Sequence, residues 1–229
     1  MNYNPILIVS GEPNSVFLEL FFKVLKKNTI KNPIILISSK KLLNLQMKKL
    51  GFKNKIRILN SSKLNSYKLN NKTINLINVE YNPDKAFEKI SNKSNIFIKK
   101  SFELAFKIIK ENNIKKFING PISKKYFLKN KFLGITEFIS QKFLAKNTCM
   151  LIFNKKLSVC PITTHLPLKL VANKINKKTI FNKISLINDF YEENFEFRPQ
   201  IAILGLNPHC ESVHKYNEDE KVIKPVKNN

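Results

Sequence analysis

The chain has 229 residues, and the 43% that are hydrophobic are spread along its whole length. This excludes a disordered or fibrous protein and leaves room for one large domain or two modest ones. The formal net charge is +25, yet among the 41 basic residues only Arg57 and Arg198 are arginine. Recognition of phosphates and bases favours the arginine fork, and the lysines are scattered along the chain, so we expect a solvated surface and no nucleic-acid partner.

The three cysteines, Cys149, Cys160 and Cys210, are odd in number and lack the spacing of a disulfide scaffold. The first residues have no basic region and no small-residue cleavage site, so they do not resemble a signal peptide. No apolar stretch approaches the ~18 residues of a membrane span. We therefore expect a soluble cytoplasmic protein with no membrane partner.

In the first half of the chain, predicted strands alternate with predicted helices. Short β-branched runs bounded by turn formers predict buried strands, and apolar residues at helical spacing predict helices. The strands are expected at residues 6–10, 33–38, 55–59, 74–79 and 115–120, and the helices at residues 16–27, 40–50 and 94–113. Such alternation is typical of an α/β fold with a mostly parallel sheet covered on both faces.

The second half is expected to continue with a helix at residues 137–147 and another at 178–194. Apolar runs at 148–153 and 157–162 could form a hairpin, and a strand that stops at Gly205 is predicted within residues 198–209. The pattern is interrupted at residues 119–135, where we expect the seam between two subdomains.

Four of the five glycines lie in the short motifs SGEP, NGPIS, LGITE and LGLNPH. Three of these motifs directly follow an apolar run. A glycine at the carboxyl end of a strand permits positive φ and close backbone approach, and ligands bind at that edge of open parallel sheets. Together the motifs favour a binding site over four unrelated turns.

Two of the three histidines share one context, because His165 and His209 each come just after the carboxyl end of a predicted strand. Two neutral imidazoles in equivalent positions predict a site for Zn²⁺, Co²⁺, Ni²⁺ or Mn²⁺, which needs a third protein ligand. His214 lies in a polar stretch and is expected to be a solvated loop residue. The third ligand stays open among Glu12, Glu211, Cys160 and Cys210, although Cys160 is expected to pack inside a strand.

Several signatures are absent from the sequence: GxGxxG, the P-loop, GxSxG and CxxC. A standard dinucleotide fingerprint, a P-loop NTPase and a nucleophile-elbow hydrolase therefore have no support.

The motifs SGEP, NGPISK, GITEF, PITTHLPLK and GLNPH occur in an order that resembles the 4-hydroxythreonine-4-phosphate dehydrogenases, the PdxA family. TTHLPL and GLNPH are the most specific of them. The resemblance implies a homodimer with two α/β/α subdomains similar to those of isocitrate and isopropylmalate dehydrogenases, here residues 1–125 and 126–229. Family members continue for another ~100 residues, a domain-scale length, so a C-terminally truncated chain is expected.

The resemblance also implies a reaction in pyridoxal phosphate (vitamin B6) biosynthesis. NAD⁺ would oxidise 4-phosphooxy-L-threonine to a β-keto acid, which decarboxylates to 3-amino-2-oxopropyl phosphate. A divalent metal (Zn, Mg, Co, Mn or Ni) would polarise the alcohol oxygen as a Lewis acid. By position, His165 and His209 become metal ligands and Thr136 a substrate contact, while the third histidine ligand and the NAD-site residues are expected beyond Asn229.

One departure from the family concerns the substrate, since Ile135 stands where the family motif GHTEF has a substrate-binding histidine. Isoleucine can neither hydrogen-bond nor carry charge. This departure favours one alternative, a related dehydrogenase of another phosphorylated hydroxy acid such as a four-carbon aldonate phosphate. The expected truncation favours another, an inactive fragment.

Overall fold

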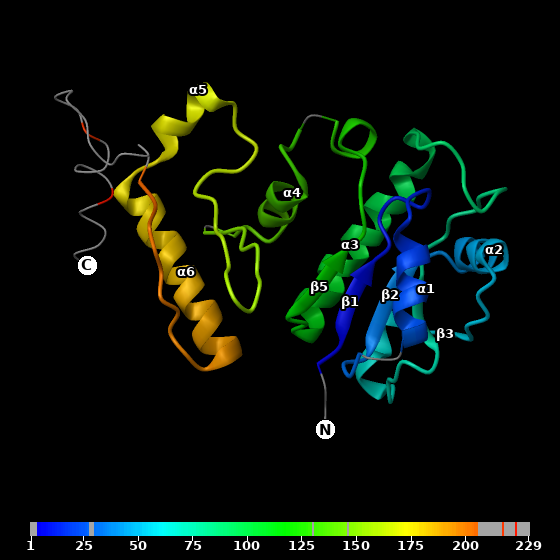
Figure 1. Cartoon of the computed structure of the whole chain (residues 1–229). Coiled ribbons are helices and arrows are strands. Elements are labelled where there is room, and N and C mark those ends of the chain that lie inside the picture. The colour runs from blue at the N-terminus through cyan, green and yellow to red at the C-terminus, as the bar shows by residue number, and fades with distance from the viewer. Residues whose placement is uncertain are drawn as a thin grey trace. The chain divides into compact units, whose positions relative to one another are not determined.

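The computed structural model describes residues 4–27, 30–129, 131–145, 147–205, 217 and 223 (Figure 1). The chain forms two compact units, residues 1–132 and 133–229. This division lies within the seam expected at residues 119–135, while the subdomain boundary at residue 125 stays a prediction. No helix in the described part of the chain is long and apolar enough to cross a membrane.

The first unit is built on a five-stranded, all-parallel sheet in the order β3-β4-β2-β1-β5. Its strands are β1 (Ile6–Val9), β2 (Ile34–Ser38), β3 (Ile56–Ile58), β4 (Ile74–Asn78) and β5 (Lys116–Asn119). All five lie where the β-branched runs predict them. The central strand β2 is buried along its whole length, which explains why its sequence is a continuous apolar run without polar alternation.

Helices cover both faces of this sheet. On one face Ile8, Leu36 and Leu76, from neighbouring strands, join a buried cluster with α1 (Phe17–Lys27) and α2 (Lys40–Leu50). On the other face lies α3 (Asn95–Asn112), where the Phe102 ring is 6.3 Å from that of Phe117 on β5. The predicted α/β class is therefore confirmed.

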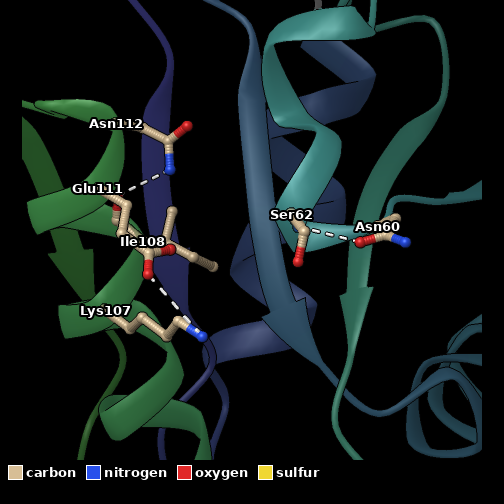
Figure 2. Close-up of polar contacts among 6 residues, drawn as sticks. All are labelled: Asn60, Ser62, Lys107, Ile108, Glu111 and Asn112. Atoms are coloured by element: carbon tan, nitrogen blue, oxygen red, sulfur yellow. Dashed lines mark hydrogen bonds and ion pairs between the residues drawn. The ribbon is translucent and has the colours of Figure 1, made fainter.

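Local capping sets where the helices begin and end. The Ser39 side chain accepts a hydrogen bond from Leu42 N at the start of α2, and Gly51 ends that helix in the left-handed region at φ 74°. In α3 the Asn112 side chain donates to Ile108 O at 3.1 Å, beside a 3.8 Å ion pair between Lys107 and Glu111 (Figure 2). Helix α3 is capped by Asn113, which lies in the left-handed region at φ 48° and whose N–H donates to Ile109 O, so both helices end close to the predicted residues.

Short helical turns complete the first unit. They are η1 (Ser61–Ser66), η2 (Asn92–Ser94) and η3 (Lys124–Leu128). At the start of η1, Ser62 N donates to Asn60 Oδ1 at 2.9 Å (Figure 2). This side-chain cap begins the turn directly after β3.

Two of the glycine motifs meet at the carboxyl edge of the sheet, because β1 and β5 are neighbours. A Cβ on Gly120 would lie 2.1 Å from Ser10 O, and one on Gly11 would lie 2.4 Å from Pro121 O. No side chain fits at such distances, so SGEP and NGPIS need glycine for close backbone packing.

The second unit consists mainly of helices: α4 (Ile135–Lys142), α5 (Leu168–Val171), η4 (Ala172–Lys174) and α6 (Lys177–Phe195). Ile180 of α6 and Ile223 form its buried core, with partly buried isoleucines around them. Rings of Phe153, Phe190 and Phe195 cluster at the other end of α6, the first and last stacked at 5.3 Å.

Several predictions for this unit are wrong. The two runs at 148–153 and 157–162 do pair antiparallel, but within the described residues their only pairing is the bridge between Ile152 and Val159. Residues 198–205 form no strand. Helix α4 ends at Lys142, short of the predicted 147. A β-branched run becomes a strand only where another strand completes its hydrogen bonds, and Ile152 and Val159 stay 60% and 53% exposed.

Candidate metal and substrate site

Helix α4 places two polar side chains of the GITEF motif together. The chain is extended at Gly134 and turns into the helix at Ile135, so Thr136 and Glu137 lie in the first turn. A carboxylate is favourable there because the first turn carries unpaired N–H groups and the positive end of the helix dipole. The motif thereby places Glu137 at the N-terminal end of α4.

The Glu137 carboxylate contacts the PITTH segment, which lies 27 residues further along the chain. Its Oε1 accepts a hydrogen bond from Thr164 Oγ1 at 3.2 Å and lies 3.6 Å from His165 Nδ1. Its Oε2 is buried and has no hydrogen-bond partner among the described residues. A buried carboxylate oxygen without a partner is costly, so this group has acceptor capacity available for a ligand or side chain.

His165 has an unusual backbone conformation, with φ at 56°. Few non-glycine residues adopt the left-handed region, and such residues occur preferentially at functional sites. The imidazole is 38% exposed, so the ring can be reached by a ligand while one edge faces Glu137.

Gly134 makes room for this pair. A Cβ built on Gly134 would lie 3.0 Å from both Glu137 Oε2 and His165 Cε1. Its extended backbone needs no special conformation, so the requirement for glycine is one of space alone. Gly134 thus leaves the space in which Glu137 and His165 lie together.

A cavity of about 300 Å³ adjoins these residues. Its lining mixes polar and apolar residues and includes three threonines, one glutamate and Lys183, whose Nζ donates to Thr148 O at 3.4 Å. The described lining residues are Thr136, Glu137, Ser140, Gln141, Thr148, Cys149, Met150, Thr164 and Lys183. A volume of this size is at the lower end of the range for small-molecule sites.

The residues predicted from sequence are only partly brought together. Thr136 lines the cavity, Ile135 precedes it half-buried at the start of α4, and His165 contacts the cavity residue Glu137. His209 lies outside the described residues, so its pairing with His165 stays a prediction. Among the described residues no group of three or more histidine, cysteine or acidic side chains is arranged to hold a metal.

The candidates for a third metal ligand lie in different parts of the chain. Glu211, Cys210 and the loop residue His214 lie outside the described residues. Glu12 belongs to the first unit and is 3% exposed, and its carboxylate accepts hydrogen bonds from Ser94 at 2.9 Å and from Asn14. These bonds make Glu12 a structural acceptor at the sheet edge.

Cys160 does not pack inside a strand as expected, but is partly exposed in a loop beside the Ile152 bridge. Burial and the neighbouring Cys149 thiol raise the pKa of Cys160 above its ordinary value. A raised pKa favours the neutral thiol, whereas metals bind the thiolate. In the protein without metal, Cys160 is therefore a neutral thiol, and its role as a ligand stays a prediction.

Sequence reasoning missed Glu137. The residue stands inside the GITEF motif, next to the predicted substrate contact Thr136, but nothing in the sequence pairs it with His165. Only the folded second unit brings the two segments together.

Five parallel strands between two layers of helices, followed by a unit that holds a polar cavity, define an α/β protein with a candidate small-molecule site. The family described as "Pyridoxal phosphate biosynthetic protein PdxA" matches residues 29–229. The chain belongs to this family.

Relatives and solved structures agree with this assignment. A protein of Sulfurihydrogenibium sp. named 4-hydroxythreonine-4-phosphate dehydrogenase is 33% identical over 96% of this chain and 69% of its own length. One of the same name from Aquifex aeolicus is 37% identical over 47% of this chain and 34% of its own length.

Two crystal structures with that name show the same fold. The Burkholderia phymatum protein has a TM-score of 0.80 at 23% identity, covering 99% of this chain and 70% of that one. The Klebsiella pneumoniae protein has a TM-score of 0.82 at 20% identity, covering 97% and 70%. At these sequence identities the structural similarity supports the fold alone.

Proposed function

We propose that the protein is a dehydrogenase that oxidises 4-phosphooxy-L-threonine with NAD⁺ and a divalent metal, in pyridoxal phosphate biosynthesis. Membership of the PdxA family, together with relatives named 4-hydroxythreonine-4-phosphate dehydrogenase, is the observation that carries the proposal. In the reaction, the substrate's secondary alcohol gives a hydride to NAD⁺ and a proton to the medium. The resulting β-keto acid loses CO₂ and leaves 3-amino-2-oxopropyl phosphate.

The residues around the cavity are compatible with a metal of this kind. His165 offers an exposed imidazole, and Glu137 adds a negative charge with a buried oxygen that has no partner among the described residues. Imidazole nitrogen with nearby carboxylate suits Zn²⁺, Co²⁺, Ni²⁺ or Mn²⁺. When bound, such an ion supplies Lewis acidity toward the alcohol oxygen. We propose His165 and His209 as its ligands.

The chain's own residues would bind and orient the substrate. Thr136 lines the cavity, and its hydroxyl can hydrogen-bond to the substrate. The Lys183 ammonium lines the same cavity and would attract a phosphorylated substrate through its charge. The enclosing side chains would exclude bulk water and strengthen these interactions. We further propose a homodimer that acts in the cytoplasm.

The test is NADH formation by the complete gene product, purified without metal and then supplied with Zn²⁺, Mg²⁺ or Co²⁺. We expect NADH with 4-phosphooxy-L-threonine only when NAD⁺ and one of these metals are present. Absence of turnover with every metal would overturn the substrate assignment. It would also favour the alternative of an inactive protein.

A second candidate is a dehydrogenase of a four-carbon aldonate phosphate, and the observation that favours it is Ile135. This residue begins α4 beside Thr136, where the family has a histidine that binds substrate. The same assay run with both substrates decides between the candidates. The Ile135→His variant should raise kcat/KM for 4-phosphooxy-L-threonine if the first candidate is right and lower turnover of the aldonate phosphate if the second is.

A further inference from the structure

We propose that Glu137 is a positioning residue for His165, holding its imidazole so that Nε2 is presented to the metal. The inference rests on the proposed function, because it requires His165 to be a metal ligand. Neither the sequence motifs nor the names of the relatives assign a role to this carboxylate.

The contact has the geometry that such a role needs. Glu137 Oε1 lies 3.6 Å from His165 Nδ1, a few tenths of an ångström beyond hydrogen-bond length. The same oxygen accepts from Thr164 Oγ1 at 3.2 Å, which ties the carboxylate to the residue just before the histidine. Glu137 Oε2 is buried without a partner among the described residues, so a small rotation of the carboxylate can offer either oxygen to Nδ1–H.

A neutral imidazole carries its proton on one of its two nitrogens, and the partner of each nitrogen decides which. A carboxylate beside Nδ1 stabilises the proton there and leaves the Nε2 lone pair free. Metal-binding histidines in proteins commonly donate their other N–H to a carboxylate in this way, which orients the ring and raises its basicity. Because Nδ1 and Nε2 lie on different edges of the ring, Glu137 is placed to orient His165 rather than to share its metal.

The surrounding backbone supports a fixed arrangement. Gly134 leaves the space in which the carboxylate and the ring lie, and His165 is held at φ 56°. A non-glycine residue is strained in the left-handed region, so this conformation persists only where neighbouring contacts define it. The Glu137 and Thr164 contacts are such neighbours.

The experiment titrates the complete gene product with Co²⁺ and Zn²⁺, following the Co²⁺ absorption spectrum, for wild type, Glu137→Gln, Glu137→Ala and His165→Ala. Loss of an outer partner of a metal-binding histidine typically weakens metal affinity by about 10–100-fold. We expect a loss in that range for Glu137→Ala and a smaller one for Glu137→Gln, whose amide oxygen still accepts. The matched control is Glu193→Ala, at an exposed acidic residue of α6, which should bind metal as wild type does.

A second readout needs no metal. In ¹⁵N-edited spectra of metal-free protein, His165 should be protonated on Nδ1 in wild type and shift toward a mixture of tautomers in Glu137→Ala. Unchanged affinity and an unchanged tautomer in Glu137→Ala would overturn the inference. A Co²⁺ spectrum showing that Glu137→Ala removes a coordinating oxygen would also overturn it, by making Glu137 a ligand.

Failure of the proposed function looks different. If His165→Ala binds Co²⁺ as tightly as wild type, His165 is no ligand, and both the proposed metal site and the inference fall. If His165→Ala loses metal while Glu137→Ala changes neither the metal affinity nor the tautomer of His165, only the inference falls.

Discussion

At the scale of single residues, the candidate site depends on side chains that meet across the second unit. Thr136 and His165 were predicted because they stand in distinctive motifs, GITEF and TTHLPL. Glu137 was not, since its partners Thr164 and His165 are far from it in sequence and the contact exists only after folding. The pairing of His209 with His165 remains a prediction, because His209 lies outside the described residues.

Substitution of Gly134 tests whether close packing around Glu137 and His165 matters for metal binding. In Gly134→Ala the new methyl group would lie 3.0 Å from Glu137 Oε2 and His165 Cε1, so one of the two side chains must move by a few tenths of an ångström. We expect Zn²⁺ affinity to fall by about 10-fold, since the ring loses its orientation. Isothermal titration measures the change.

The fold itself should tolerate that substitution. The backbone at Gly134 is extended, a conformation open to any residue, so the fold loses only the modest preference for glycine over alanine at the N-cap of α4. A thermal transition close to that of wild type, with weakened metal binding, is the predicted combination. Wild-type affinity in Gly134→Ala would show that the close packing does not matter to the site.

At the scale of elements, the first unit was predictable because its strands and helices carry local signals. Ser39 and Gly51 bracket α2, and the apolar runs of β1, β2 and β4 become buried strands. The second unit was harder to predict. Its apolar runs have the composition of strands, but apart from the single Ile152–Val159 bridge the described residues give them no ladder partner, and composition alone does not supply one.

Substitution of Gly51 tests how much the left-handed cap at the end of α2 contributes to stability. It is left-handed at φ 74°, and a Cβ there would meet nothing within 4 Å, so any cost of substitution comes from the backbone conformation. We expect Gly51→Ala to lower the free energy of unfolding by about 1–2 kcal/mol. Gly51→Asn should lose less, because asparagine tolerates this conformation. Urea denaturation of both variants measures this, and a Gly51→Ala variant as stable as wild type would contradict the assignment of Gly51 as a left-handed cap.

At the scale of the whole molecule, the alternation of strands and helices predicted a parallel α/β sheet, but it could not predict the strand order. β4 lies between β2 and β3, and β5 joins the far side of β1 after α3. Such an order depends on which neighbours bury the most apolar surface, which no short window of sequence records. The PdxA family match was predictable because its motifs are uncommon and ordered along the chain.

We propose that His165 holds a metal that is needed for oxidation of a phosphorylated hydroxy acid. The most direct test compares NADH formation from 4-phosphooxy-L-threonine by the complete gene product and its His165→Ala variant, each with saturating Zn²⁺ or Mg²⁺. The matched control is His214→Ala, a histidine of the polar stretch that the proposal leaves without a role. We expect a loss of activity on the order of 100-fold or more in His165→Ala and none in His214→Ala, because even outer partners of metal ligands typically contribute about 10–100-fold. Wild-type activity in His165→Ala would contradict the proposal.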